Sequence, residues 1–105
     1  MSDKLRTELV ENLLAVLTTM NNEDEVYDFL LDLCTVREIA EMSQRLEVAR
    51  LLADGQSYVY VQEVTGASAT TISRVSKCLN YGSGGYEDAL AIIAREDATV
   101  NGNEE

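Results

Sequence analysis

The chain has 105 residues, which is the length of one domain, and it contains no proline and no histidine. Its 19 acidic and 8 basic residues give a formal net charge of −11, which argues against a large basic surface for nucleic acid. Abundant helix formers predict an all-α fold. No apolar run approaches the roughly 20 residues that a transmembrane helix needs. The N-terminus has no signal-peptide apolar block, so we expect a cytoplasmic protein that does not bind membranes.

A first helix is predicted from the N-terminus to about Met20, with Ser2 and Asp3 as capping residues. Its apolar residues recur at helical spacing and form one continuous stripe: Leu5, Leu9, Leu13, Val16 or Leu17, and Met20. The stripe is wide, which favours a packing or dimerisation face that more than one neighbour covers.

Asn22 followed by Glu25 predicts a capped second helix that ends at about Leu33. Its expected inward residues are Val26, Phe29, Leu30 and Leu33. Its other side carries aspartates at four-residue spacing: Asp24, Asp28 and Asp32. Because a helix spreads these carboxylates too far apart for one cation, the pattern predicts a solvated acidic face and no metal site.

A full capping box at Thr35–Glu38 predicts that a third helix starts at Val36 and continues to Asp54, where Gly55 ends it. Its apolar series is Ile39, Met42, Leu46, Ala49 and Leu52. Most of the remaining positive charge lies on this helix, at Arg37, Arg45 and Arg50.

The stretch from Gln56 to Leu79 predicts two short helices joined by a tight turn at residues 65–67, the layout of a helix-turn-helix. Ser57 and Ser68 are the expected caps, and Gly66 supplies the backbone angles that the turn needs. The residues expected to pack between the helices are Val61, Val64, Ile72, Val75 and Leu79.

The outward side of the second helix is small and polar, as expected of a helix that enters a DNA groove. It consists of Ala69, Thr70, Ser73 and Lys77. The segment from Ser57 to Asn80 contains one acid and two basic residues, so it carries +1 and the remaining −12 lies elsewhere. Such a face would bind DNA weakly and need a partner subunit. An ordinary helical hairpin in a bundle is the alternative.

The glycine-rich run Asn80–Gly85 is expected to be a flexible linker, because no lysine follows and no strand precedes it as in a P-loop. A final helix from Tyr86 to about Ala94 would place its apolar residues inward: Leu90, Ile92 and Ile93. One domain over residues 1–96 and a disordered acidic tail over residues 97–105 follow.

The two cysteines, Cys34 and Cys78, are expected to be small buried thiols in a reducing compartment. Without histidine or a second cysteine pair they do not form a zinc site. The sequence also lacks a nucleophile beside a base, so an enzyme is not predicted.

The span from Thr35 to Tyr86 resembles the Trp repressor superfamily and is most similar to its YerC/YecD, or TrpR-like, proteins. The resemblance rests on three runs: TVRE at 35–38, QRLEVARLL at 44–52 and TTISRVSKCLNYGSGGY at 70–86. It implies an all-α, intertwined homodimer with a helix-turn-helix at about residues 57–79, two of which sit about one DNA turn apart. It also implies transcriptional regulation by operator binding.

In the Trp repressor an amino acid lies between the long central helix and the recognition helix. The resemblance carries that ligand site to Thr35, Arg45, Arg74 and Cys78. Cys78 stands where the family has serine, and a thiol is the weaker hydrogen-bonding group, which argues against tryptophan itself. Two arginines could still hold a carboxylate or phosphate, so a small anionic or amino-acid corepressor is the expected ligand and no other cofactor is implied. The alternative is that both arginines only pair with acids such as Glu38 or Glu41.

We therefore predict a homodimeric, sequence-specific regulator that binds double-stranded DNA. The predicted DNA-contacting residues are Ser68, Ala69, Thr70, Thr71, Ser73 and Lys77. The alternative is an interaction module that kept the fold and lost strong DNA binding. The net charge and the apolar residues Val59 and Tyr60 on the supporting helix favour this alternative.

Overall fold

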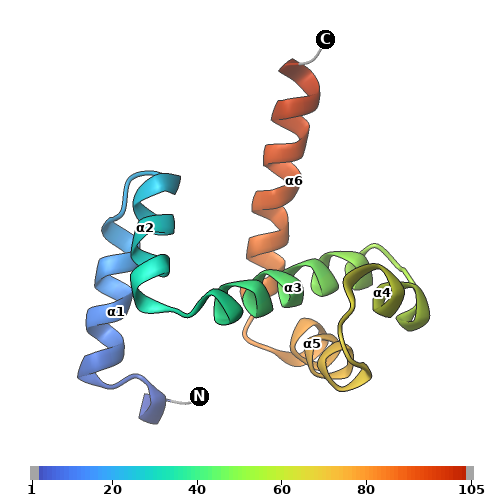
Figure 1. Cartoon of the computed structure of the whole chain (residues 1–105), viewed down its shortest axis with the longest axis horizontal. Coiled ribbons are helices and arrows are strands. Elements are labelled where there is room, and N and C mark those ends of the chain that lie inside the picture. The colour runs from blue at the N-terminus through green and yellow to red at the C-terminus, as the bar shows by residue number, and fades with distance from the viewer. Residues whose placement is uncertain (1–2, 104–105) are drawn as a thin grey trace. The chain divides into compact units, whose positions relative to one another are not determined.

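The computed structural model describes residues 3–103, with the side-chain environment of residues 4–98, and it is helical throughout, which confirms the predicted all-α class. A short 3-10 helix, η1 (Asp3–Leu5), precedes the α-helices. These are α1 (Glu8–Thr19), α2 (Glu23–Leu33), α3 (Val36–Ala53), α4 (Tyr58–Thr65), α5 (Ala69–Tyr81) and α6 (Gly85–Asn103) (Figure 1). No helix in this described range is long and apolar enough to cross a membrane.

The chain divides into two compact units, one ending at Ile39 and the other beginning at Ala40. In the first unit, α1 begins later than predicted, because Thr7 is its cap: the Thr7 hydroxyl accepts a hydrogen bond from the Val10 amide at 3.3 Å. Asp3 lies in the 3-10 turn instead, and the other predicted cap, Ser2, lies outside the described residues.

Side-chain caps start both following helices at the predicted positions, and the bonds at α3 form a full capping box. The Asn22 side chain accepts from the Glu25 amide at 2.9 Å, and the Glu25 carboxylate accepts from the Asn21 amide at 3.2 Å. At α3 the Thr35 hydroxyl accepts from the Glu38 amide at 3.0 Å, while the Glu38 carboxylate accepts from the Thr35 amide at 2.8 Å. These reciprocal bonds satisfy amide donors that have no partner within the helix.

The first unit has no fully buried side chain among its described residues. The half-buried apolar residues are Val10, Leu14, Leu17, Met20, Val26, Phe29, Leu30, Cys34 and Ile39. The first residues of the apolar stripe predicted for the N-terminal helix are solvent-exposed, with Leu5 75% and Leu9 79% exposed. Leu33 was expected to be inward and is exposed, so that prediction is wrong. One copy of the chain therefore leaves much of this apolar surface uncovered.

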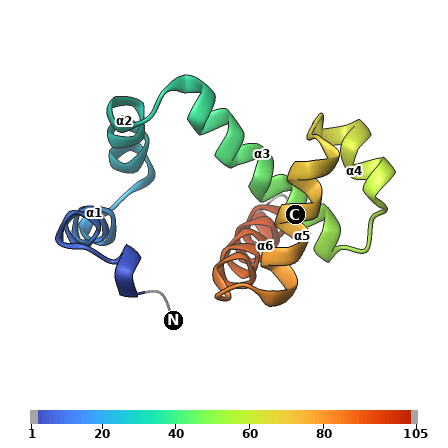
Figure 2. The same ribbon diagram turned by 90° about the horizontal axis from the view of Figure 1, so that it is seen from below.

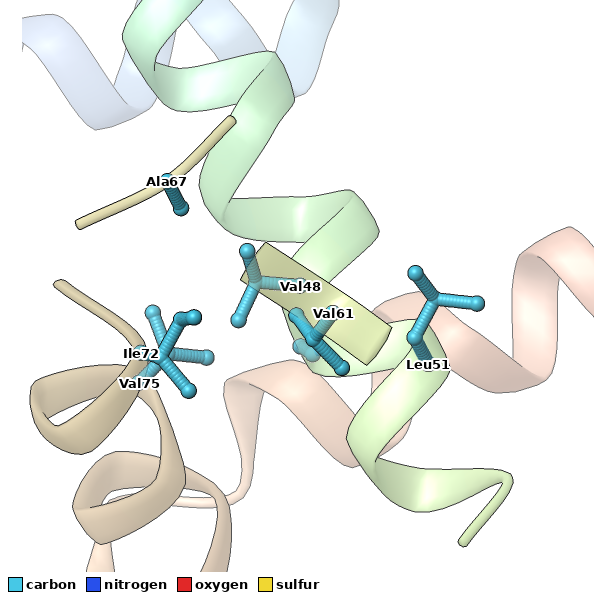
Figure 3. Close-up of a cluster of buried hydrophobic side chains, with 7 residues drawn as sticks. Val48, Leu51, Val61, Ala67, Ile72 and Val75 are labelled. Atoms are coloured by element: carbon cyan, nitrogen blue, oxygen red, sulfur yellow. The ribbon is translucent and has the colours of Figure 1, made fainter. Parts of the chain in front are cut away.

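The second unit holds the core. Its buried residues come from α3, α4, the following turn and α5 (Figure 3): Val48, Ala49, Leu51, Val61, Ala67, Ile72 and Val75. Leu52, Tyr86 and Leu90 pack against this cluster, so the first turns of α6 complete it. Both ribbon views show α4 and α5 beside the C-terminal half of α3 (Figure 2). Val64 was expected in this core and is exposed, so that part of the prediction is wrong.

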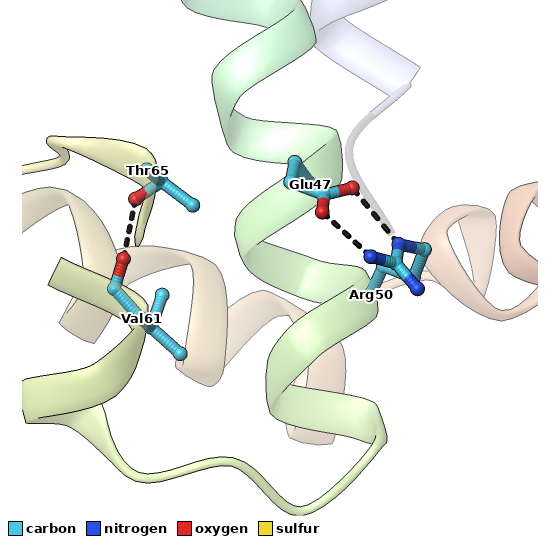
Figure 4. Close-up of polar contacts among 4 residues, drawn as sticks. All are labelled: Glu47, Arg50, Val61 and Thr65. Atoms are coloured by element: carbon cyan, nitrogen blue, oxygen red, sulfur yellow. Dashed lines mark hydrogen bonds and ion pairs between the residues drawn. The ribbon is translucent and has the colours of Figure 1, made fainter. Parts of the chain in front are cut away.

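The turn between α4 and α5 lies where the sequence predicts it, and Gly66 adopts a left-handed conformation with φ +75°. Thr65 orders this turn. Its hydroxyl donates to the Val61 carbonyl at 2.7 Å (Figure 4) and accepts from the Ala67 amide at 3.1 Å. The Gln44 side chain on α3 donates to the Thr65 carbonyl at 3.1 Å, which ties the turn to the long helix.

The connection from α5 to α6 is shorter than the glycine-rich run, because α5 continues to Tyr81. Gly82 donates its amide to the Cys78 carbonyl at 2.8 Å, and a Cβ atom at this position would overlap the same carbonyl. Gly84 has φ +90°. These glycines therefore form a defined turn with local backbone requirements, in contrast to the flexible linker that the composition predicts.

Helix α6 extends to Asn103, well beyond the predicted end near Ala94. The described part of the predicted tail is therefore helical, and residues 104–105 lie outside the described range. The domain boundary at residue 96 stays a prediction. Leu90 and Ile93 are half-buried as expected, whereas Ile92 is exposed.

A cavity and an exposed polar row on one helix

Helix α5 presents three rows of side chains, each with members three and then four residues apart, so each row follows one side of the helix. The first row is buried at Ile72 and Val75, which belong to the core, and half-buried at Leu79. The second row, Thr70, Ser73 and Lys77, is exposed. The third row, Thr71, Arg74 and Cys78, lines a cavity. The same short helix therefore joins the core, an outer surface and a candidate binding site.

The exposed row begins beside the N-terminus of α5. Ser68 caps this helix, and its Oγ accepts from the Thr71 amide at 3.1 Å. Ala69 is also exposed, so the outer surface of the first two turns consists of small side chains. Helix α5 carries two basic residues, Arg74 and Lys77, and no acid. Lys77 lies on the exposed row and Arg74 on the cavity side, so this row carries one cation in a strongly acidic chain.

The cavity lies between α3, α5 and the start of α6 and has a volume of about 270 Å³. Its lining residues are Arg45, Thr71, Arg74, Val75, Cys78 and Tyr86. Arg45, Arg74 and Cys78, three of the four predicted ligand residues, therefore meet at one site. The fourth, Thr35, belongs to the other unit, where it caps α3.

A second, larger cavity of about 510 Å³ shares Arg45, Cys78 and Tyr86 with the first. Its other lining residues are Met42, Leu46, Gly82, Ser83, Gly85 and Ala89. The two cavities therefore adjoin, with cationic and hydroxyl groups at the α5 end and mainly apolar groups at the other.

Neither Arg45 nor Arg74 makes a hydrogen bond or an ion pair with any described residue. The predicted alternative, in which both arginines pair with acids such as Glu38, is thus wrong for this part of the chain. Two guanidinium groups face one cavity with their donors available.

The neighbouring Arg50, also on α3, shows the contrast. Its Nε and Nη2 donate to the Glu47 carboxylate at 2.9 Å and 2.7 Å (Figure 4). This hydrogen bonding lowers the pKa of Glu47 and raises the pKa of Arg50. Arg50 lines neither cavity. On α3, Arg50 therefore forms an ion pair within the helix, whereas Arg45 faces the candidate site.

Sequence reasoning placed two lining residues differently. Thr71 was assigned to the DNA surface, yet it lines the cavity, and its hydroxyl accepts from Ser68 Oγ at 3.1 Å. The sequence predicts Tyr86 only as the start of the last helix, and its place at the end of the run at 70–86 is the one signal that it belongs to a site. Both cysteines were expected to be buried, whereas Cys34 is half-buried and Cys78 exposed.

The capped helix pair joined at Gly66 and the adjoining cavity with two arginines are the features of the second unit that bear on the class of protein. The chain belongs to the Trp repressor family: the family model described as Trp repressor protein matches residues 8–93. Members of this family are regulators rather than enzymes.

Individual relatives agree. The chain is 48% identical over 88 residues to YerC of Bacillus subtilis (strain 168), itself described as uncharacterized, covering 84% of this chain and 85% of YerC. A crystal structure of a candidate Trp repressor from Staphylococcus aureus matches with a TM-score of 0.83 and 38% identity over 90% of this chain and 94% of that one. A TrpR-like protein from Eubacterium eligens ATCC 27750 matches with a TM-score of 0.82 and 43% identity, over 88% and 95% of the two chains.

Proposed function

We propose that this protein is a cytoplasmic, homodimeric transcriptional regulator that binds double-stranded DNA in a sequence-specific manner. Helices α4 and α5 form the helix-turn-helix, and α5 enters the major groove. The observation that carries this proposal is the outer row of α5. Its side chains are small, polar or cationic and exposed, while the opposite row anchors the helix in the core.

The contacts follow from these side chains. Ser68, Ala69, Thr70 and Ser73 have short, exposed side chains that let α5 approach base edges and the nearby backbone closely, whereas Thr71 lies on the cavity side of the helix. The hydroxyl groups exchange hydrogen bonds with bases, and the methyl group of alanine can meet a thymine methyl. Lys77, one turn further along, neutralises a phosphate.

Dimerisation is supported by the first unit. A pair of helices without a single fully buried described side chain cannot supply a stable core by itself. Exposed leucines such as Leu5, Leu9 and Leu13 offer the apolar area that a second copy would cover. An intertwined dimer buries this surface and places two copies of α5 on successive turns of the DNA.

Control by a small ligand is the remaining part of the proposal. The cavity row and the DNA row lie on the same helix, so a ligand that contacts Arg74 and Cys78 also restrains Thr70 and Ser73. Arg45 joins the site from α3, and Thr35 is included from the family resemblance. A ligand that favours one orientation of α5 would change DNA affinity by its differential binding.

A selection from random or genomic DNA fragments at low salt tests the central claim. We expect enrichment of sites with two related half-sites about one helical turn apart. The proposal would be refuted if the selection enriched no sequence and if no fragment were retarded by the protein in a gel-shift assay at low salt.

A second function is favoured by one specific observation. Most of the large side chains of α4 are exposed: Tyr58 50%, Val59 67%, Tyr60 43% and Val64 53%. Such a surface is suited to a protein partner. The variant Lys77→Glu separates the two functions, because it should abolish DNA retention but leave capture of a partner on α4 largely intact. Failure to recover a specific partner from nuclease-treated extract would count against the interaction module.

A further inference from the structure

We infer, on the basis of the DNA binding proposed above, that Tyr81 at the C-terminal end of α5 donates a hydrogen bond to a DNA phosphate. This contact lies beyond the phosphate that Lys77 neutralises, and it raises affinity without adding charge. A strongly acidic chain with one cation on its exposed row thereby gains a second contact with the DNA backbone.

Tyr81 extends the exposed row of α5 by one helical turn. It follows Lys77 by four residues, as Lys77 follows Ser73, and residues at this spacing share one side of a helix. Its side chain is 84% exposed, the largest fraction for any large hydrophobic residue in the described part of the chain. It lines neither cavity. Tyr81 therefore belongs with the proposed DNA contacts and not with the candidate ligand site.

The length of this row places Tyr81 at the DNA backbone. With a rise of about 1.5 Å per residue, Tyr81 lies about 16 Å from Thr70 along the helix axis. The major groove is only about 12 Å wide. Recognition helices meet base edges with their N-terminal residues, so the far end of a row longer than the groove width reaches the phosphates at the groove edge. Lys77 and Tyr81, about 6 Å apart along the axis, both approach that edge.

The hydroxyl group of Tyr81 is available for such a contact, because it makes no hydrogen bond with any residue that the structure describes. The turn after α5 fixes its position. Gly82 donates its amide to the Cys78 carbonyl at 2.8 Å, which closes the last turn of the helix around Tyr81. A phenol hydroxyl donates one hydrogen bond and brings no positive charge. It therefore releases no counterion, so it contributes to affinity but not to the salt dependence of affinity.

Replacing Tyr81 by phenylalanine removes only the hydroxyl group. Fluorescence anisotropy between 50 and 200 mM salt, with a fragment retained in the DNA selection, measures the effect. Since a dimer loses two hydrogen bonds, Tyr81→Phe should bind about 5- to 150-fold more weakly than the parent at every salt concentration. The slope of log affinity against log salt should stay that of the parent, because no cation is lost.

Replacing Tyr81 by lysine tests the position directly. A cation beside a phosphate releases a counterion, so Tyr81→Lys should make the slope of the dimer steeper by about 2 units. At 50 mM salt this variant should bind more tightly than Tyr81→Phe. A ring that served only the fold, or that met a protein partner, would not produce the steeper slope.

Tyr27→Phe is the matched control, because Tyr27 is another exposed tyrosine and lies on α2 in the first unit. It should bind DNA as the parent does. Sedimentation velocity and chemical denaturation of all variants verify that the dimer and the fold are unchanged.

Three results would overturn the inference: parent-like affinity of Tyr81→Phe, a changed slope for Tyr81→Phe, or an unchanged slope for Tyr81→Lys. If the parent is retained on DNA and any of these results is obtained, only the Tyr81 contact falls and the proposed regulator stands. If the parent is not retained on any DNA, both are refuted.

Discussion

Replacing Lys77 by glutamine removes the one cation of the exposed row of α5, and the salt dependence of DNA binding should report its loss. Arg74 faces the cavity, and the supporting helix α4 has no basic residue and carries Glu63. Each subunit should thus neutralise about one or two phosphates, giving the dimer a slope of about −2 to −4 in log affinity against log salt. Affinity should fall about 15- to 250-fold between 50 and 200 mM salt.

Lys77→Gln removes one phosphate contact per subunit, so the slope should become shallower by about 2 units. Fluorescence anisotropy with a selected operator over that salt range measures this change. Lys4→Gln is the control, since Lys4 is an exposed lysine of the first unit. A parent slope near −8, or a slope that Lys77→Gln does not alter, would refute the assignment of α5 as the electrostatic contact.

Gly66→Ala should destabilise the protein by about 1 kcal/mol because alanine disfavours φ +75°, although a Cβ there would meet nothing within 4 Å. Chemical denaturation at fixed protein concentration measures this change, with Gly85→Ala as the control. Gly85 is the first residue of α6, has no positive φ and has open space around a Cβ, so its replacement by alanine should stabilise the protein by about 0.5 kcal/mol. Equal changes in stability for the two variants would contradict the backbone argument. Leu9→Glu should shift the dimer toward monomer in sedimentation velocity if a second copy covers this 79% exposed leucine, and an unchanged dimer would exclude it from the interface. Arg50 lowers the pKa of Glu47, so at pH values above the ordinary carboxyl pKa the pair should stabilise the fold by at most about 0.5 kcal/mol. This stabilisation should be lost as the pH falls through the lowered pKa of Glu47. An NMR titration of Glu47 in the parent and in Arg50→Gln checks the direction of the shift.

The features that sequence reasoning predicted correctly are those encoded within a few residues. Thr35 and Glu38 satisfy each other's amides across one helical turn, and the left-handed angles at Gly66 need a glycine wherever that turn occurs. Apolar spacing was less reliable, because it shows which side chains share a face but not whether a neighbour covers that face. Val64 follows such spacing after Val61 and is nevertheless exposed.

Some residues of the candidate site could likewise be predicted from the sequence, and others could not. The two arginines and Cys78 could be named beforehand only because runs of the chain resemble a known family. Spacing along α5 places Thr71 on the same side as Arg74, but nothing local in the sequence indicated that this side faces a cavity, since a helix is rotated into place by its packing partners.

The sequence by itself determined an all-α chain, the caps of α2 to α5, the turn at Gly66 and membership of the Trp repressor family, because helix signals are local and the family runs are long. Only the tertiary structure decided that Arg45 from α3, Arg74 from α5 and Tyr86 from α6 line one cavity. It also decided that, among the described residues, Arg50 has an ion-pair partner and Arg45 does not. Contacts between distant segments depend on how the helices pack around Val48, Val61 and Ile72, and no spacing along one helix contains that information.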